Sequence, residues 1–189
     1  MLVKRVSFVD TGRIELGDVI SFTLKTGELV EAMAVQETSS GMLYLTVDCI
    51  ALATMFTTTD TAGVVDYEHS NLRNVLNTVI LERFPDEIRG LMVGMRMKDG
   101  GEDLLRIPTE KEIFGSNVIG KDEDGVKQFF GMDDIRNRVV ARNGSTYGYW
   151  SQNRKRDTAA YFAVAYSNGN ATFYPAGTSY GVRPAFCVS

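Results

Sequence analysis

The first third of the chain has the hydrophobic and polar pattern of β-strands. Apolar residues alternate weakly with polar ones over 18–24, and mostly apolar runs follow over 29–36 and 42–51. The segments 26–28 (Thr-Gly-Glu) and 39–41 (Ser-Ser-Gly) separate these runs, and short Gly-containing connections between strands are typical of hairpins. We therefore expect three consecutive strands that form an antiparallel meander.

The middle of the chain has the pattern of two helices. The segment 70–84 is expected to be a helix that begins at the N-cap Ser70 and ends before Pro85. A shorter helix should begin at Thr109, which forms a capping box with Glu112. In the first helix, apolar residues recur three and four positions apart and should form one buried face. These residues are Leu72, Val75, Leu76, Val79 and Ile80.

The last third of the chain returns to a strand pattern. The segments 159–166 and 171–174 flank an Asn-Gly pair, which is a strong hairpin signal because both residues tolerate a positive φ. A last strand is expected over 181–188, and the turn-rich segment 57–63 is expected to be a loop. We find no repeat and no linker, so the pattern predicts one α+β domain over 1–189 in which early and late strands share a core.

Composition narrows the function classes. The chain has 189 residues, of which 44% are hydrophobic and 23% are charged, as in ordinary globular proteins. Its net charge of −4 argues against general nucleic-acid binding, which needs a basic surface. No apolar run approaches the roughly 18 residues of a membrane helix, and the first residues lack the apolar segment of a signal peptide. We expect a soluble protein, made in a cytoplasm and without membrane insertion.

Residues for catalysis or metal binding are sparse. Cys49 and Cys187 lie far apart in apolar stretches and are expected to be free and buried. His69 is the single histidine, which excludes sites that need two. The acidic stretch 122–125 lacks the ligand spacing of an EF-hand, and Asp follows the basic triplet 154–156, so both are expected to be solvated loops. We therefore expect no catalytic residue, no metal site and no cofactor.

The segment 143–180 has the composition of a recognition surface. It holds six of the eight tyrosines, the single tryptophan, and many Asn, Ser, Thr and Gly residues. Tyrosine provides contact area at low entropic cost, and the small polar residues provide adaptable hydrogen bonds. Strands and turns use the same residues, so both interpretations stay open, and the structural one is preferred for Tyr161 and Phe162. The candidate ligand-binding residues are Tyr147, Tyr149, Gln152, Asn153, Arg154, Tyr166, Asn168, Asn170, Tyr174, Thr178 and Tyr180.

Five motifs, taken in order, resemble a known family. They are Gly17-Asp18-Val19-Ile20, Leu72-Arg73-Asn74-Val75-Leu76-Asn77, the segment 105–114, Tyr149-Trp150-Ser151-Gln152-Asn153 and Gly181-Val182-Arg183-Pro184-Ala185-Phe186. Together they resemble the bacterial and phage domain of unknown function 6273 (DUF6273), a relative of C-type lectin-like folds. Two positions depart from the family pattern. Val75 replaces a tryptophan, and Ser-Gln-Asn follows Trp150 where Leu-Arg-Ser is common.

The resemblance implies a C-type lectin-like fold, with a small twisted antiparallel sheet, two helices and a loop-rich C-terminal display segment. Such folds in phage relatives display a variable surface for attachment to hosts, and some are diversified by retroelements. The segment 149–180 resembles such a variable region in composition. The Glu-Pro-Asn and Trp-Asn-Asp motifs of calcium-dependent sugar binding are absent.

Three residues are expected to support this surface. Trp150 should fill the core below the display loops, because tryptophan buries a large apolar area. Arg183 lies in an apolar strand, so its guanidinium needs a fixed carboxylate or carbonyl groups. We take Glu112 as the hypothetical partner.

Three classes of function remain. The first is a non-enzymatic ligand-binding protein of phage or prophage origin, which recognises a protein or glycan on a host surface and is associated with the virion. The second is a structural decoration or assembly protein, which would bind other virion proteins or form a homo-oligomer. The third, a formylglycine-generating-enzyme-like oxidase, is disfavoured because Cys49 and Cys187 lack the close spacing of its cysteine pair.

Overall fold

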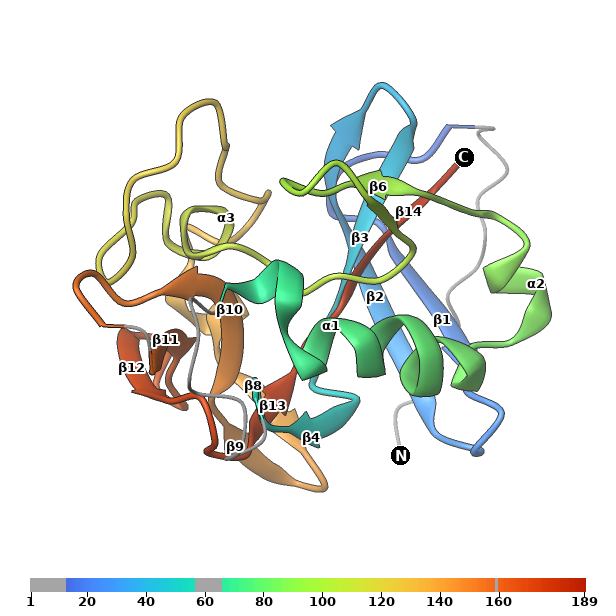
Figure 1. The fold of residues 1–189 in the computed structure, drawn as a ribbon. Coiled ribbons are helices and arrows are strands. Elements are labelled where there is room, and N and C mark those ends of the chain that lie inside the picture. Colours follow the sequence, from blue (N-terminus) through green and yellow to red (C-terminus); the bar gives the residue numbers. More distant parts are fainter. Residues whose placement is uncertain (1–12, 57–65, 159) are drawn as a thin grey trace.

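The protein is built mostly from antiparallel strands with a few short helices. The computed structural model describes residues 13–56, 66–158 and 160–189. Two five-stranded sheets lie side by side, the first on the right and the second on the left of Figure 1. The first sheet is antiparallel throughout. Its strands, in spatial order, are β1 (Val19–Thr23), β2 (Leu29–Thr38), β3 (Gly41–Thr46), β14 (Ala185–Val188) and β5 (Met92–Val93).

The second sheet combines late strands with one early strand. Only its β10–β13 pair is parallel. In spatial order the strands are β12 (Ala171–Pro175), β11 (Tyr161–Ala165), β10 (Tyr149–Arg154), β13 (Tyr180–Val182) and β4 (Ala51–Ala53). The two small hairpins are formed by β6 (Met95–Arg96) with β7 (Glu102–Asp103), and by β8 (Val140–Arg142) with β9 (Ser145–Tyr147).

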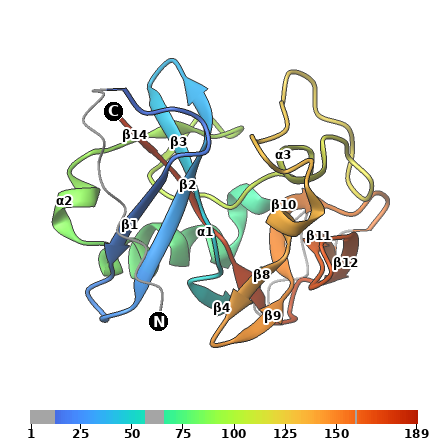
Figure 2. The same cartoon turned by 180° about the vertical axis from the view of Figure 1, so that it is seen from behind.

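The predicted N-terminal meander is confirmed. The strands β1, β2 and β3 are consecutive antiparallel neighbours (Figure 2). Gly27 adopts a φ of +86° in the first turn, a left-handed conformation that costs glycine little. The expected loop over 57–63 lies outside the described residues.

The long predicted helix begins as expected but changes its pitch. The Ser70 side chain accepts a hydrogen bond from the Arg73 N–H and caps α1 (Asn71–Val75). The chain then continues as a π-helical segment, η2 (Leu76–Ile80), and a 3₁₀ turn, η3 (Leu81–Arg83). A π turn contains more residues than an α turn, so side chains after Val75 are rotated relative to the expected buried face. Ile80 is buried as expected, whereas Val79 is 53% exposed. The shorter helices are η1 (Tyr67–His69), α2 (Asp86–Arg89), α3 (Glu110–Phe114) and η4 (Ile135–Arg138).

The predicted last strand is divided between the two sheets. The prediction of one strand over 181–188 is wrong, because β13 pairs with β4 in the second sheet whereas β14 pairs with β3 in the first. Pro184 lies at the crossing, and proline has no N–H with which to continue a strand ladder. The C-terminal segment therefore connects the two sheets.

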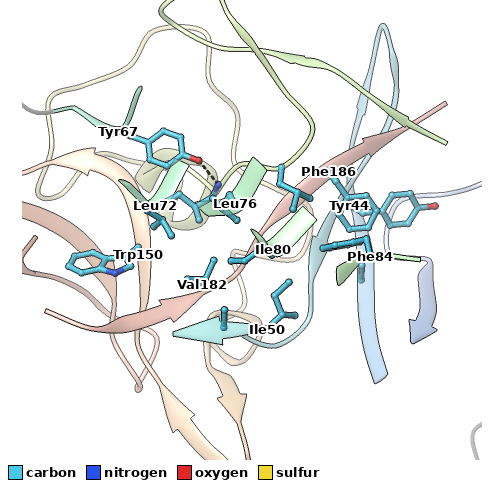
Figure 3. Close-up of a cluster of buried hydrophobic side chains, with 14 of the residues drawn as sticks. Tyr44, Ile50, Tyr67, Leu72, Leu76, Ile80, Phe84, Trp150, Val182 and Phe186 are labelled. Carbon is cyan, nitrogen blue, oxygen red and sulfur yellow. Dashed lines mark hydrogen bonds between the residues drawn. The ribbon is translucent and has the colours of Figure 1, made fainter. Parts of the chain in front are cut away.

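One hydrophobic core spans both sheets (Figure 3). Near the first sheet, the Tyr44 and Phe186 rings stack with centroids 5.8 Å apart. Near the second sheet, Trp150 is fully buried and its indole Nε1–H donates to the Ala53 carbonyl at 2.9 Å. Early and late strands thus share a core, as the pattern predicted. Across the three described ranges, no helix is both long enough and apolar enough to cross a membrane.

Candidate functional site

The β11–β12 hairpin carries the exposed part of the predicted recognition segment. The Tyr166 N–H donates to the Asn170 carbonyl, and the Gly169 N–H donates to the Tyr166 carbonyl, both at 2.8 Å. Gly169 has a φ of +82°, and a Cβ there would lie 2.7 Å from Cγ1 of Ile135 in η4. The predicted Asn-Gly hairpin is confirmed, and its tip packs closely against η4.

Three tyrosines form a continuous row on one face of this hairpin and of β13. We call Tyr166, Tyr174 and Tyr180 the tyrosine face. The Tyr166 and Tyr174 rings are stacked, with centroids 6.2 Å apart and an interplanar angle of 14°. Tyr174 and Tyr180 are 4.6 Å apart, and Tyr180 meets the buried Trp150 edge-on at 5.3 Å. The row runs from the core to Tyr166, which is 40% exposed.

The buried Trp150 supports the inner end of this row. Aromatic pairs contribute roughly 0.5–1.5 kcal/mol each beyond the area they bury, and the Trp150 indole at the base of the row is bonded to a backbone carbonyl. Burial, together with the neighbouring Tyr174 hydroxyl, raises the pKa of Tyr180 above its ordinary value. The Tyr180 hydroxyl therefore stays protonated and able to donate at any physiological pH.

Four further candidate residues lie near the surface. Asn168 and Asn170 are exposed at the tip of the hairpin. Thr178 is half-buried in the turn after β12, where its N–H donates to the Pro175 carbonyl at 2.9 Å. Tyr147 is half-buried in β9. Asn168, Asn170 and Thr178 thus lie in the β11–β12 hairpin or in the turn that follows it, as part of the same segment as the tyrosine face. Tyr147 belongs to a separate hairpin.

Tyr149 does not belong to the surface. Its side chain has no exposed area, and its hydroxyl accepts a hydrogen bond from Nη1 of Arg183 at 3.1 Å. The Arg183 guanidinium also lies over the Tyr149 ring, 5.2 Å from its centroid. Other parts of the chain cover both faces of β10, so the alternation along this strand exposes neither face. The prediction that Tyr149 contacts a ligand is wrong.

The hypothetical Arg183–Glu112 pair is also wrong. Arg183 is 2% exposed, and its Nε and Nη1 donate to the carbonyls of Thr46 and Asn137 at 2.7 and 3.0 Å. Glu112 instead accepts two hydrogen bonds from Arg106, at 2.6 and 2.7 Å. The crossing between the two sheets brings Arg183 to backbone carbonyls, whereas the third position of α3 directs Glu112 toward Arg106.

Gln152, Asn153 and Arg154 lie in another place, at a polar cleft of about 500 Å³ beside the end of β10. The Gln152 amide donates to the Ile107 carbonyl, and the Asn153 side-chain oxygen accepts from the Glu110 N–H, both at 2.6 Å. Both side chains are only 8% exposed. They hold the chain around α3, and both residues also line the cleft, so their assignment to ligand binding stays a prediction. Arg154 is half-buried and lines the cleft.

A buried carboxylate that the sequence analysis missed holds one wall of this cleft. Glu110 has no exposed area, and its two oxygens accept hydrogen bonds from the N–H groups of Val118, Ile119 and Gly120 at 2.8, 2.6 and 2.8 Å. These bonds fix the loop that leads to the cleft residues 121–123. Acidic residues are common in the first turn of a helix, so no sequence signal distinguished Glu110.

Several acidic residues of the cleft are engaged in ion pairs. The Asp66 carboxylate lies 2.6 Å from Nδ1 of His69, and this hydrogen bond raises the pKa of the imidazole. Glu123 pairs with Lys98. Burial by itself would raise the pKa of the Glu123 carboxyl, but the Lys98 hydrogen bond and charge bring it below the ordinary value. Within the described part of the chain, no three His, Cys, Asp or Glu side chains are arranged to hold a metal ion.

A family model described as "Domain of unknown function (DUF6273)" matches residues 43–189. The chain belongs to the DUF6273 family. No curated protein and no solved structure matches it.

The DUF6273 match begins within β3 and includes both candidate surfaces. The whole second sheet, with the tyrosine face, lies inside the DUF6273 region, as do α3 and the polar cleft. The strands β1 and β2 precede the match.

Proposed function

We propose that this DUF6273 domain is a non-enzymatic binding protein of phage or prophage origin, which recognises a protein or glycan on a host surface through the tyrosine face. The observation that carries the proposal is the row of three tyrosines based on the buried Trp150. Rigid aromatic side chains bind with little loss of conformational freedom. The exposed amides of Asn168 and Asn170 beside them supply hydrogen-bonding groups.

The proposal includes a C-type lectin-like fold and a surface that varies between related copies. The position of β14 between β3 and β5, which joins the C-terminal strand to the early strands, supports the first part. The second part is supported by the exposure of Tyr166, Asn168 and Asn170 at one hairpin tip, where substitution leaves the core intact. Sequences from related genomes test it, because retroelement diversification predicts variation confined to these positions.

The thiol groups support a non-enzymatic role. Cys49 and Cys187 are both free and buried, as predicted. Burial raises the pKa of the Cys49 thiol to about 12, so this group stays protonated at neutral pH. A nucleophilic or metal-binding cysteine needs an accessible thiolate.

The experiment is a cell-binding assay with fluorescently labelled protein and a panel of bacterial strains. The double variant Tyr166→Ala/Tyr174→Ala should bind at least about tenfold more weakly, because aromatic anchors contribute most to binding energy. Leu29→Ala and Val79→Ala, which remove exposed apolar side chains elsewhere, serve as matched controls and should bind like the unmodified protein. Equal binding by the double variant and the controls would contradict the proposal.

Two further measurements identify the kind of partner. Protease treatment of the cells should abolish binding to a protein, and periodate treatment should abolish binding to a glycan. Light scattering on the purified protein gives its oligomeric state. A stable oligomer that dissociates in the double variant, with no binding to any strain, would replace this proposal with the decoration or assembly role.

A further inference from the structure

In the part of the chain that the structure describes, the strand β12 has one edge without a strand partner. It is the last strand of the second sheet and lies at the outer rim of the molecule in both ribbon views (Figures 1 and 2). On its inner side it pairs with β11 over its whole length. Among the described residues, no strand pairs with its outer side. An edge of this kind is a template for another strand.

The hydrogen bonds of the hairpin decide which backbone groups face this edge. Tyr166 and Asn170 are hydrogen-bonded at one end of the ladder. Residue pairs that are hydrogen-bonded alternate with pairs that are not along an antiparallel ladder. At the other end of the ladder, the hydrogen bond from the Ala176 N–H to the Ala160 carbonyl follows the same alternation. The N–H and C=O groups of Ala171 and Phe173 therefore point away from β11.

The free edge is short and has a defined end. Pro175 has no N–H to offer, and its carbonyl already accepts the hydrogen bond from the Thr178 N–H. Proline is one of the residues that limit pairing at natural sheet edges. The edge thus offers two N–H groups and two carbonyls, from Ala171 and Phe173.

Different side chains flank the edge on its two sides. The tyrosine face lies on one side. On the other side lies Phe173, which is 38% exposed and meets the Tyr161 ring at 5.8 Å. The Lys155 ammonium lies 4.3 Å from the centroid of the Phe173 ring, a cation–π geometry. A strand added here would place alternate side chains over tyrosines and next to a cation.

We propose that the free edge of β12 binds an extended peptide segment of a partner protein as a further strand, with acidic side chains at alternate positions facing Lys155. The backbone groups of Ala171 and Phe173 supply the hydrogen bonds of this added strand. The proposal rests on the proposed binding function and names its ligand as protein. It also gives Lys155, the middle residue of the basic triplet 154–156, a role.

The charge of Lys155 decides between a partner protein and a second copy of the chain. Two copies that paired edge to edge through β12 would be related by a twofold axis, which would bring both Lys155 side chains to the same side of the joined sheet. Like charges at close range are unfavourable. An acidic segment of another protein meets the same edge with complementary charge.

The test is selection from a random-peptide display library on the full-length protein, followed by affinity measurement on synthetic peptides. Enriched peptides should carry acidic residues at alternate positions. Ala171→Pro removes one outward N–H without breaking a bond to β11 and should weaken binding about tenfold or more. The Lys155→Glu variant should no longer bind the acidic peptides. The control variant Lys121→Glu, changed on the wall of the polar cleft, should bind them like the unmodified protein.

Two additions make the result independent of folding defects. Circular dichroism and thermal unfolding check that Ala171→Pro is folded, and Phe173→Pro removes the other outward N–H of the edge without breaking a bond to β11. Peptides N-methylated at alternate residues should bind in one frame and fail in the other, since only one edge of the peptide faces β12. Binding in both frames, failure to enrich any peptide, or affinities for Ala171→Pro and Lys155→Glu within about twofold of the unmodified protein would overturn the proposal.

These outcomes are separable from those of the proposed function. Cell binding that is lost in Tyr166→Ala/Tyr174→Ala but unchanged in Ala171→Pro would keep the proposed function and remove the edge. Peptide binding that depends on Ala171, with cell binding independent of the tyrosines, would keep the edge and remove the proposed function.

Discussion

The substitution Glu110→Gln tests how one buried carboxylate holds the loop beside the polar cleft. Its Oε1 accepts the N–H groups of Val118 and Ile119, and its Oε2 accepts that of Gly120. A glutamine side chain keeps one carbonyl oxygen for the first two donors. Its amide NH₂ group cannot accept a hydrogen bond, so the Gly120 N–H would face another donor.

The magnitude follows from these three bonds. Hydrogen bonds to a charged group contribute roughly 1.5–3 kcal/mol each, against roughly 0.5–1.5 kcal/mol for neutral ones. Two bonds therefore weaken by about 1 kcal/mol each, and the unsatisfied Gly120 N–H costs about 1–3 kcal/mol more. The smaller cost of burying a neutral amide offsets part of this loss. We expect the free energy of unfolding to fall by about 2–4 kcal/mol.

Urea unfolding followed by circular dichroism measures this loss, and amide hydrogen exchange locates it. The N–H groups of Val118, Ile119 and Gly120 should exchange faster by a larger factor than those of β10. Glu87→Gln is the matched control, because Glu87 is an exposed acidic residue in the first turn of α2, and it should change stability by less than about 0.5 kcal/mol. If the two variants unfolded at the same urea concentration, the reasoning would be refuted.

Two further predictions concern ion pairs. A double-mutant cycle on Arg106 and Glu112 should give a coupling energy of about 1–3 kcal/mol, because the pair is bidentate and largely buried, whereas Arg183 and Glu112 should show none. A coupling between Arg183 and Glu112 above about 0.5 kcal/mol would contradict the structure. His69, the single histidine, should titrate above its ordinary pKa of 6.5 because Asp66 stabilises the imidazolium. The Asp66–His69 pair stabilises the fold below pH 6.5, and its contribution is lost as the pH rises through the folded-state pKa of His69. Proton NMR should show a lower titration midpoint for His69 in Asp66→Asn. An unchanged midpoint would exclude the pair.

Features that depend on neighbouring residues were predictable. The Asn-Gly turn of the β11–β12 hairpin, the N-cap Ser70 and the capping box of Thr109 and Glu112 are all as expected. Each depends on hydrogen bonds and backbone angles within a few residues. The sequence also indicated a surface rich in tyrosine, although it did not separate the exposed tyrosines from the buried Tyr149.

Features that depend on distant contacts were not predictable. The partners of the Arg183 guanidinium, the carbonyls of Thr46 and Asn137, lie 137 and 46 residues away in the sequence and are decided by how the two sheets meet. Segments that are distant in the sequence also cover both faces of β10, so this strand is buried on both sides.

The sequence by itself determined the class of fold, most of the hairpins and caps, and the composition of the candidate binding segment. Only the tertiary structure decided that Tyr166, Tyr174 and Tyr180 form one row on Trp150, and that no strand of the described residues pairs with the outer edge of β12. The physical reason is the range of the interactions. Turns and caps form between residues close in sequence, whereas ring contacts, buried charges and sheet edges depend on segments brought together by packing.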